Sequence, residues 1–280
     1  MLNATDYRRN RVSNERVALV TGASSGFGML TATMLREKGL KVFGTSRMPK
    51  QTNANGFEML QLDIDSDLSA KTCVSEVVAK AGRLDVLINN AGYAFNGAVE
   101  ETSEDEAKAL FETNFFGAVR MTEAVLPAMR QRRSGQIVNV GSLAGTFPLP
   151  FDGFYAAAKA ALLAYSEALR YEVRAFGIKV SVVEPGFFLT NISKARKLAA
   201  NRIADYDTLR ERVLSQVQKE VNEGGDPTIV AKTIVEIVES PSPRLRYPVG
   251  REKRYLLLRK VLPQGMIESG VRRHWKIDAQ

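Results

Sequence analysis

Residues 16–28 read Arg16-Val-Ala-Leu-Val20 and then Thr21-Gly-Ala-Ser-Ser-Gly-Phe-Gly28, the pattern of a strand followed by a glycine-rich turn. The short apolar run is typical of a buried strand, and a helical pattern follows from Met29 to Lys38. Glycines let the backbone approach a pyrophosphate, and the helix behind them presents free N–H groups and the positive end of its dipole. The pattern predicts phosphate binding; the alternative is a tight strand-to-helix turn without a ligand.

Strand and helix patterns alternate along the rest of the chain without a gap. Further strands are expected at residues 40–47, 57–63, 84–92, 136–142 and 178–186, with a last edge strand at 246–250. Helices are expected at residues 68–81, 103–111, 117–132, 154–176 and 226–238, and Asn114 falls between two of them because its amide is unfavourable in a helix interior. This alternation predicts an α/β fold, a Rossmann-like doubly wound parallel sheet of about seven strands flanked by helices in a single domain. Ligands of such sheets bind at the carboxyl ends of the strands.

The second strand ends in Ser46 and Arg47, where this fold carries an acidic residue when it binds the ribose hydroxyls of NAD. No carboxylate stands here to repel a 2′-phosphate, and a guanidinium is available to bind one. The sequence therefore favours NADP (NADPH) over NAD, the alternative being an ordinary surface arginine. Asp63, at the end of the third strand, is a candidate for contact with an adenine.

Tyr155-Ala-Ala-Ala-Lys159 lies in the expected helix 154–176, so the phenol and the ammonium group are one turn apart on one face. A free tyrosine has a pKa of about 10, and a fixed cation nearby moves that pKa toward neutrality. Ser142, at the end of the fifth strand, adds a hydroxyl if that strand and this helix meet. Together they predict a proton-transfer site for a carbonyl or an alcohol. Taken alone, the Tyr–Lys spacing is also that of a chance pair on a helix surface.

Composition excludes several other kinds of site. The 280 residues are 45% apolar and 25% charged, as in soluble globular proteins. The one cysteine, Cys73, excludes an internal disulfide framework, and the one histidine, His274, argues against Ser-His-Asp hydrolysis and multi-histidine metal sites. No apolar run approaches the roughly 18 residues of a membrane span, and no signal-peptide core begins the chain. The expected location is cytoplasmic, with no integral membrane segment.

The expected domain organisation follows from these patterns. Residues 1–14 are a polar, poorly ordered lead-in, residues 15–250 form the NAD(P)-binding catalytic domain, and residues 251–280 form a basic C-terminal extension. Within the domain, residues 190–224 are an insertion, expected as charged amphipathic helix from Ile192 to Glu223 with no role in the sheet.

The net charge of +8 is concentrated near the C-terminus, because residues 244–280 hold ten Lys and Arg against three Asp and Glu. The remainder is close to neutral, so nucleic acid is not an expected partner. Three interpretations of the basic end stay open. It is a solvated surface, an apolar cover over the substrate mouth, or a weak contact with a membrane surface. The cover would consist of Tyr255, Leu256, Leu257, Leu258, Val261 and Leu262.

Seven motifs occur in the order and at the spacings of one known family. They are Thr21-Gly22 with Gly26 and Gly28, Asp63, Asn89-Asn90-Ala91-Gly92, Asn114, Ser142, Tyr155 with Lys159, and Pro185-Gly186 followed by Thr190. From about Arg16 to Gly250 the chain resembles the short-chain dehydrogenase/reductases of the compact single-domain subfamily. Its C-terminal segment resembles the 17β-hydroxysteroid and retinol dehydrogenase-like branch. Ala158 departs from the pattern, since the family often has serine there, and we expect no effect on the chemistry.

The resemblance implies an NAD(P)-dependent oxidoreductase acting on CH–OH groups. Tyr155 would exchange a proton with the substrate oxygen, and Lys159 would hold the nicotinamide ribose and lower the tyrosine pKa. Ser142 would orient the substrate oxygen, and Asn114 would hold a water that links Lys159 to solvent. The implied cofactor contacts are Gly22, Ser24, Ser25, Gly26, Phe27, Gly28, Ser46, Arg47, Asp63, Ile64, Asn90, Ala91, Gly92, Tyr155, Lys159, Pro185, Gly186, Phe188 and Thr190. The resemblance implies no metal, and a homodimer or homotetramer that pairs through helices 117–132 and 154–176.

Apolar residues around the expected site favour a small hydrophobic ketone or secondary alcohol as the substrate. They are Phe147, Leu149, Pro150, Phe151, Phe154, Phe187, Phe188 and Leu189. Two other classes remain as alternatives. A non-enzymatic NADP-binding regulatory or redox-sensing module would have no need of Ser142, Tyr155 and Lys159. A sugar-nucleotide epimerase or dehydratase of the extended subfamily would have more sequence after Gly186.

Overall fold

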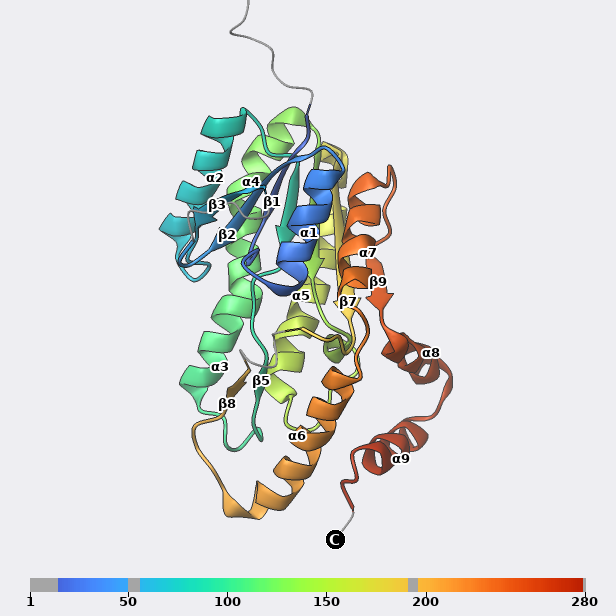
Figure 1. Cartoon of the computed structure of the whole chain (residues 1–280). Helices are drawn as coiled ribbons and strands as arrows, with labels where there is room; N and C mark the ends of the chain where they lie inside the picture. Colours follow the sequence, from blue (N-terminus) through green and yellow to red (C-terminus); the bar gives the residue numbers. More distant parts are fainter. Residues whose placement is uncertain (1–14, 50–55, 191–195, 279–280) are drawn as a thin grey trace, which may run out of the picture.

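Seven strands form one parallel sheet in the computed structural model, which describes residues 15–49, 56–190 and 196–278 (Figure 1). The strands are β1 (Val17–Val20), β2 (Lys41–Ser46), β3 (Glu58–Gln61), β4 (Val86–Asn89), β6 (Gly135–Val140), β7 (Ile178–Pro185) and β9 (Arg246–Val249). Their order is β3-β2-β1-β4-β6-β7-β9, and each neighbouring pair is parallel. The chain therefore builds one half of the sheet outward from β1 and then the other half outward from β4. The predicted fold class is confirmed.

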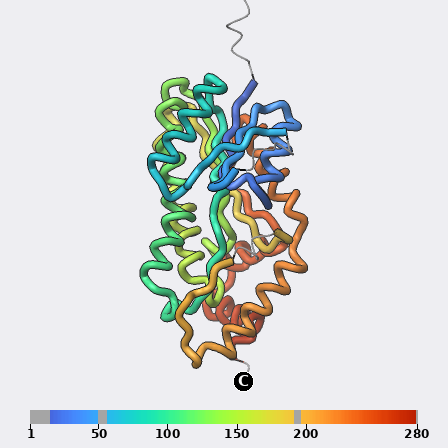
Figure 2. Tube along the Cα trace, turned by 60° about the vertical axis from the view of Figure 1, so that its left-hand side comes forward, coloured from blue at the N-terminus to red at the C-terminus, as the bar shows by residue number. Residues whose placement is uncertain are grey.

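Helices cover both faces of this sheet (Figures 1 and 2). On one face lie α1 (Gly26–Glu37) and α7 (Thr228–Glu239), packed against each other. The other face is covered by α2 (Asp67–Ala81), α4 (Gly117–Arg132) and α5 (Gly153–Glu172). A helix of this kind brings the chain back to the end of the sheet where the previous strand began, so the next strand runs parallel to it.

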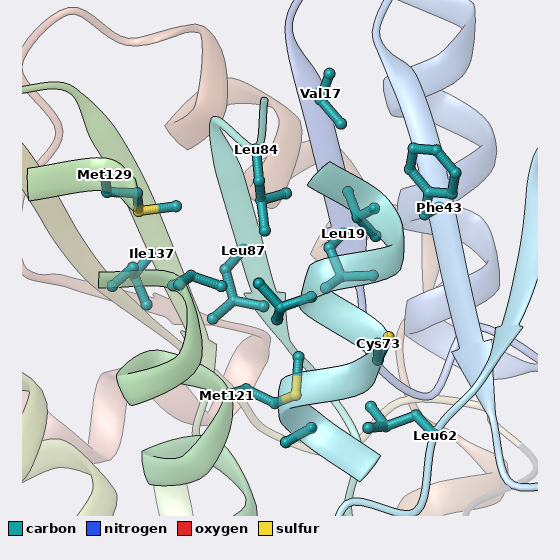
Figure 3. Close-up of a cluster of buried hydrophobic side chains, with 14 of the residues drawn as sticks. Val17, Leu19, Phe43, Leu62, Cys73, Leu84, Leu87, Met121, Met129 and Ile137 are labelled. Atoms are coloured by element: carbon teal, nitrogen blue, oxygen red, sulfur yellow. The ribbon is translucent and has the colours of Figure 1, made fainter. Parts of the chain in front are cut away.

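Alternate residues of the central strand enter different cores. Val17 and Leu19 pack beneath α2, α4 and α5, whereas Ala18 and Val20 pack beneath α1 and α7. Figure 3 shows part of the first cluster, where Leu19 and other strand residues meet side chains of α2 and α4. Because both faces of the sheet are buried, each strand is a continuous apolar run, and such runs predict strands directly from the sequence.

The predicted strands are in the right places, but several are shorter than expected. β3 ends at Gln61 and β4 ends at Asn89, so the residues that follow them belong to loops at the sheet edge. The last predicted edge strand is confirmed as β9 beside β7. The separation of helices 103–111 and 117–132 is wrong, because a π-helical turn at Glu112–Phe116 joins α3 (Glu104–Phe111) to α4.

The insertion after β7 differs from its expected form. Lys197–Leu198 form a short strand, β8, that pairs with β5 (Phe95–Asn96) in a second, two-stranded sheet. Continuous helix begins with a 3₁₀ turn at Ala204–Tyr206 that runs into α6 (Asp207–Asn222), so the expectation of helix from Ile192 with no sheet role is wrong over residues 196–203. The physical reason is backbone pairing, because Lys197 and Ala199 donate to the carbonyls of Ala94 and Asn96. Residues 191–195 and the expected lead-in 1–14 lie outside the described residues.

The C-terminal extension follows β9 and lies beyond the same end of the sheet as α6 (Figure 1). It forms a 3₁₀ turn at Arg251–Lys253, then α8 (Arg254–Val261) and α9 (Gln264–His274). Pro263 separates the two helices, as the sequence indicated for the end of α8. In the part of the chain that the structure describes, no helix is both long enough and apolar enough to cross a membrane.

Candidate active site

The residues that follow β4, β6 and β7 line a cavity of about 610 Å³. Ten predicted site residues lie in its wall: Phe27, Asn90, Gly92, Ser142, Tyr155, Lys159, Pro185, Gly186, Phe188 and Thr190. The other predicted residues lie outside this wall: Gly22, Ser24, Ser25, Gly26, Gly28, Ser46, Arg47, Asp63, Ile64, Ala91 and Asn114. Most of these follow β1, β2 and β3, so they continue the same sheet edge away from the cavity.

α5 carries the predicted acid and the predicted ammonium group. Tyr155 is half-buried, and Lys159 is 7% exposed. The Lys159 Nζ donates to the Val140 carbonyl (3.1 Å) and lies 5.8 Å from the centre of the Tyr155 ring. Ser142 follows β6, and its Oγ accepts from the Ala144 N–H at 3.1 Å. The strand end and the helix therefore meet, which brings hydroxyl, phenol and ammonium to one cavity.

Burial disfavours the charged form of both groups on α5. It raises the pKa of Tyr155 above its ordinary value, the charge of Asp152 acts in the same direction, and the Ser142 hydroxyl opposes them. It also lowers the pKa of Lys159 to about 8. The expected shift of the Tyr155 pKa toward neutrality is therefore wrong for this structure, because desolvation and the charge of Asp152 outweigh the hydrogen bond from Ser142. At pH 7 the phenol is a proton donor rather than a phenolate.

Asn114 lies in the π-helical turn and is 2% exposed. Its Oδ1 accepts from the Tyr93 N–H (3.0 Å) and its Nδ2 donates to the Tyr93 carbonyl (2.9 Å). A Cβ at Gly92 would meet Asn114 Oδ1 at 2.9 Å and Lys159 Nζ at 3.8 Å. The amide thus joins the helix to the loop after β4, close to the ammonium group of Lys159. π-helical turns of this kind are often found at functional sites.

The glycine turn is tied to the end of β4. Asn90 Nδ2 donates to the carbonyls of Thr21 (2.9 Å) and Gly22 (3.2 Å), and Thr21 Oγ1 accepts from the Asn90 N–H at 2.9 Å. Gly26 has φ +57°, which favours glycine, and has open space where a side chain would stand. A Cβ at Gly28 would lie 2.4 Å from the Gly22 carbonyl oxygen. The turn leaves an open cradle in front of the α1 N-terminus, which fits a pyrophosphate.

The end of β2 offers donors for a further anionic group. Ser46 Oγ is buried and has no hydrogen-bond partner among the described residues, and Arg47 beside it is exposed. An unpartnered buried hydroxyl indicates a missing acceptor. Asp63 is exposed after β3, whereas Ile64 is buried and its carbonyl accepts from Arg120. The residues present at this edge therefore fit a dinucleotide with an added phosphate.

The turn after β7 forms part of the cavity wall. Gly186 donates to the Val249 carbonyl (2.9 Å), and a Cβ there would lie 2.1 Å from Glu252 Oε2. Phe188 is 3% exposed and packs edge-to-face on Phe27 of the glycine turn, with ring centres 5.7 Å apart. These contacts join the first and last parts of the sheet edge into one continuous surface.

Comparisons with known proteins agree with this geometry. The family model of the short chain dehydrogenases matches residues 16–201. A 3-ketodihydrosphingosine reductase of Bacteroides thetaiotaomicron is 40% identical over 261 residues, which are 92% of this chain and 97% of that protein. The crystal structure of a short-chain dehydrogenase from Streptomyces avermitilis superposes with a TM-score of 0.80 at 34% identity, over 95% of this chain and 98% of the other.

The chain belongs to the short-chain dehydrogenase family. A further family structure, the closed form of a serine dehydrogenase complexed with NADP+, has a TM-score of 0.73 at 26% identity and covers 85% of this chain and 95% of its own. Like its relatives, this short-chain dehydrogenase is an NAD(P)-dependent oxidoreductase. The cofactor supplies or takes up the hydride when it is bound, and the protein supplies position, proton and electrostatics. Membership in the 17β-hydroxysteroid and retinol dehydrogenase-like branch stays a prediction.

The predicted apolar wall is correct in part. Phe147, Leu149, Pro150, Phe187 and Phe188 line the cavity. The remaining three predicted wall residues, Phe151, Phe154 and Leu189, do not line it. Leu189 is 57% exposed. Phe151, in the loop before α5, packs with residues of α6 and α9, and Phe154, in the first turn of α5, packs with Phe95 of β5.

Sequence reasoning missed two groups of cavity residues. The first consists of two ionisable side chains, Asp152, whose charge acts on Tyr155, and Arg196. The second comes from α6 and α9 and includes Glu220, His274 and Trp275. Asp152 could have been noticed as an acid three residues before Tyr155. The α9 residues gave no sequence signal, because nothing in their pattern indicates that the chain folds back over the cavity.

Proposed function

We propose that this short-chain dehydrogenase is an NADP-dependent enzyme that interconverts a hydrophobic ketone and a secondary alcohol. One observation carries the proposal: the Tyr155 phenol, still protonated at neutral pH, lies with Ser142 and Lys159 in a cavity whose wall is mostly apolar. In reduction, Tyr155 donates its proton to the substrate oxygen, which Ser142 orients. Lys159 stabilises the phenolate that forms, and Asn114 positions the water that returns a proton to Lys159.

NADP rather than NAD is favoured by Ser46 and Arg47. The unpartnered Ser46 hydroxyl and the exposed Arg47 guanidinium stand together where the 2′-phosphate of NADP would lie. A hydrogen bond to a charged group is worth about 1.5–3 kcal/mol. We expect NADPH to bind roughly ten- to a hundredfold more tightly than NADH, and Arg47→Ala to remove most of that preference. Equal affinities of the wild-type enzyme for both cofactors, measured by titration, would reject NADP specificity.

A long apolar substrate is favoured by the C-terminal extension. Tyr255 of α8 stacks on Phe147 with ring centres 5.6 Å apart, and Arg259 donates to the Thr146 carbonyl. Leu256 and Leu258 of α8 line the cavity, as do Met266 and Val271 of α9. A relative named for a long-chain amino ketone, the 3-ketodihydrosphingosine reductase, supports the same substrate class.

The function is tested with ketones of increasing chain length. Purified enzyme is mixed with NADPH and a series of unbranched alkyl ketones, and cofactor consumption is followed by absorbance. We expect kcat/KM to rise with chain length, because each methylene buried in an apolar cavity contributes about 0.8 kcal/mol. The proposal fails if no ketone in the series is reduced. A rate that is independent of chain length would remove the hydrophobic substrate class.

Two partners complete the proposal. We infer that the enzyme is a homodimer or homotetramer through the outer faces of α4 and α5. Tyr171 of α5 is exposed there, and so is Phe116 at the end of the π-helical turn before α4. We also infer a weak contact between the outer face of α8 and an anionic membrane surface. Leu257 and Val261, 66% and 76% exposed, stand there among basic residues. Light scattering at micromolar concentration tests the first inference, since a mass near 30.9 kDa would contradict it.

A further inference from the structure

Asp152 is a buried carboxyl group for which the proposed chemistry has no use. It stands immediately before α5 and three residues before Tyr155, and it is 8% exposed. Its side chain does not cap the helix, and no described residue donates a hydrogen bond or ion pair to its carboxylate. Its remaining exposure is to the cavity, which it lines. A buried carboxylate without a donor is costly, so its presence here needs an explanation.

The backbone holds Asp152 in this position. Phe151, the preceding residue, has φ +61°, a left-handed conformation that is unfavourable for an aromatic residue. Its carbonyl accepts from the Gly97 N–H (2.9 Å) and from Asn96 Nδ2 (3.1 Å). Its ring packs edge-to-face on Tyr206, with ring centres 6.2 Å apart. These contacts fix the turn from which the carboxylate enters the cavity, at a cost in backbone strain that is typical of functional sites.

Arg196 is the second unsatisfied group in the same wall. Its Nε is buried and has no hydrogen-bond partner among the described residues. Its charge acts on Asp152 from a distance, yet the two side chains form no ion pair within 4.0 Å. Burial raises the pKa of Asp152 well above its ordinary range, and Arg196 opposes this only in part. A buried acceptor and a buried donor therefore face the cavity, and neither satisfies the other.

We propose that Asp152 and Arg196 form a head-group subsite that selects ketones with a polar group on the carbon next to the carbonyl. The Asp152 carboxyl group hydrogen-bonds to a hydroxyl or an ammonium group on that carbon, and the positive charge of an ammonium group favours the ionised carboxylate as the acceptor. The Arg196 Nε donates to an oxygen one carbon further along the head group. The alkyl chain then extends in the opposite direction, toward α8 and α9. The subsite rests on the proposed function, because it places the polar group relative to the carbonyl that Tyr155 protonates.

The chemistry of the site favours such an amphiphile over a plain ketone. The cavity wall holds Asp152, Arg196 and Lys159, and it also holds apolar side chains such as Phe147, Leu149, Leu256 and Val271. Charged residues of the C-terminal part and α6, among them Glu220 and Arg254, line it as well. A substrate with one polar end and one apolar end satisfies both kinds of side chain. A site that hydrogen-bonds a substrate group rejects the analogue without that group, because its own polar atoms are then left unpaired.

Three ketones of equal chain length test the subsite: one unsubstituted, one with a hydroxyl and one with an amine on the neighbouring carbon. For the wild-type enzyme we expect kcat/KM to be about ten- to a hundredfold higher for one or both substituted ketones than for the plain one. Asp152→Asn should reduce this ratio at least tenfold for the amine, and less for the hydroxyl, to which an amide oxygen can still accept. Asp105→Asn, at an exposed acid of α3, is the matched control and should keep the ratio.

Binding gives a second readout that does not depend on turnover. Trp275 is the only tryptophan and lines the cavity, so its fluorescence reports ligand binding directly. The corresponding amino, hydroxy and plain long-chain alcohols are titrated into the wild type and Asp152→Asn. The subsite is supported if the wild type binds the substituted alcohols more tightly than the plain one and Asp152→Asn does not. This support holds even if no ketone is reduced, because the lack of reduction would reject only the proposed reaction.

Equal dissociation constants for the three alcohols in the wild type would overturn the proposal, and so would a preference that Asp152→Asn leaves unchanged. If that variant does not fold, Arg196→Met tests the second group of the subsite. The wild type should bind an alcohol with an additional terminal hydroxyl more tightly than the same alcohol without it. Arg196→Met should reduce this ratio of affinities at least tenfold. No change in that ratio also overturns the proposal.

Discussion

Tyr155 and Lys159 stand one turn apart in surroundings that disfavour charge on either side chain. Burial raises the pKa of the phenol and lowers that of the ammonium group to about 8. The two shifts keep the phenol protonated while leaving the lysine charge sensitive to small changes near neutral pH. An arrangement of this kind suits a group that gives its proton only when negative charge appears on the substrate oxygen.

Replacing Tyr155 with phenylalanine removes the proton and leaves the ring in place. We expect kcat for ketone reduction to fall by about 10²–10⁴-fold, the usual contribution of a general acid. NADPH affinity should stay within about twofold, because in the proposed roles Lys159 binds the ribose and the phenyl ring still fills the same space. Steady-state kinetics and a cofactor titration measure both. A variant that keeps more than roughly a tenth of wild-type kcat would show that another group donates the proton.

The lowered pKa of Lys159 predicts a pH dependence. Lysine is charged below its pKa and neutral above it, so the cation that stabilises the phenolate is lost as the pH rises through about 8. We expect kcat/KM for reduction to be level below this pH and to decline above it by about tenfold per unit. Lys159→Arg keeps its charge at all these pH values. Its profile should be lower but free of that decline, and an unchanged decline would assign the pKa to another group.

At the scale of elements, α6 is attached to the domain by a buried ion pair. Arg210 of α6 and Glu101 of the loop before α3 are 5% and 1% exposed, and their side chains bond directly. Glu101 also accepts from the backbone N–H groups of Ile203 (2.9 Å) and Ala98 (3.2 Å). The cavity wall includes Val217 of α6, so the ion pair determines the position of one side of the cavity.

Breaking this pair should destabilise the protein strongly. Arg210→Met leaves Glu101 buried without its cation, which typically costs about 3–5 kcal/mol. Urea unfolding measures the loss, and the double variant Glu101→Gln/Arg210→Met should recover much of it, because no charge then remains buried. Lys219→Ala serves as the control, since its pair with Glu223 is exposed and should contribute less than about 1 kcal/mol. A loss below about 1 kcal/mol for Arg210→Met would contradict the assigned role.

The sequence predicted these elements unevenly, for physical reasons. Strands that are buried on both faces appear as apolar runs, and amphipathic helices show a regular apolar spacing. The seven strands of the main sheet and α5 were therefore predicted correctly. The π-helical turn at Asn114 was missed, because its cause is a pair of hydrogen bonds to Tyr93, a residue distant in the sequence. β8 was missed for the same reason, since two residues become a strand only through pairing with β5.

The candidate site shows the same division. Gly28 and Lys159 could be placed from motif spacing, because the backbone geometry around them is local. The burial of Asp152 and the direction of the Tyr155 pKa shift depend on distant segments of the chain, which motif spacing does not reveal. The tail was identified from its charge and its leucines. The position of the tail at the cavity depends on the packing of Trp275 against Val213 and Val217 of α6. No local sequence pattern predicts this contact between distant segments.

Across the whole molecule, the first half of the chain supplies most of the proposed cofactor contacts, and α8 and α9 of the last segment line the cavity. α8 and α9 present two faces. Leu256 and Leu258 line the cavity, whereas Leu257 and Val261 face outward and are mostly exposed. His274 Nε2 lies 3.3 Å from Glu220 Oε1 of α6, and the Arg212 guanidinium of α6 donates to the Lys276 carbonyl (2.8 Å). These contacts favour a cover over the cavity ahead of a purely solvated surface.

Truncation after Lys253 decides the role of this cover. The cut removes α8 and α9 but keeps Glu252, which lies against the turn that carries Gly186 and Phe187. We expect KM for long-chain ketones to rise at least tenfold and the gain in kcat/KM per methylene to shrink, because the chain loses its apolar wall. The dissociation constant for NADPH should stay within about twofold, since the glycine turn, Ser46 and Lys159 are untouched. An unchanged KM would show that the extension does not cover the substrate.

The same truncation separates the cover from the membrane contact. Vesicles containing anionic lipid should bind the full chain and release the truncated one if the outer face of α8 contacts a membrane. Leu257→Glu with Val261→Glu isolates that contact, because both side chains point away from the cavity and the charges oppose insertion. We expect this double variant to lose vesicle binding and to keep the chain-length dependence in solution. If the full chain and the double variant bind the vesicles equally, α8 serves only as the cover of the cavity.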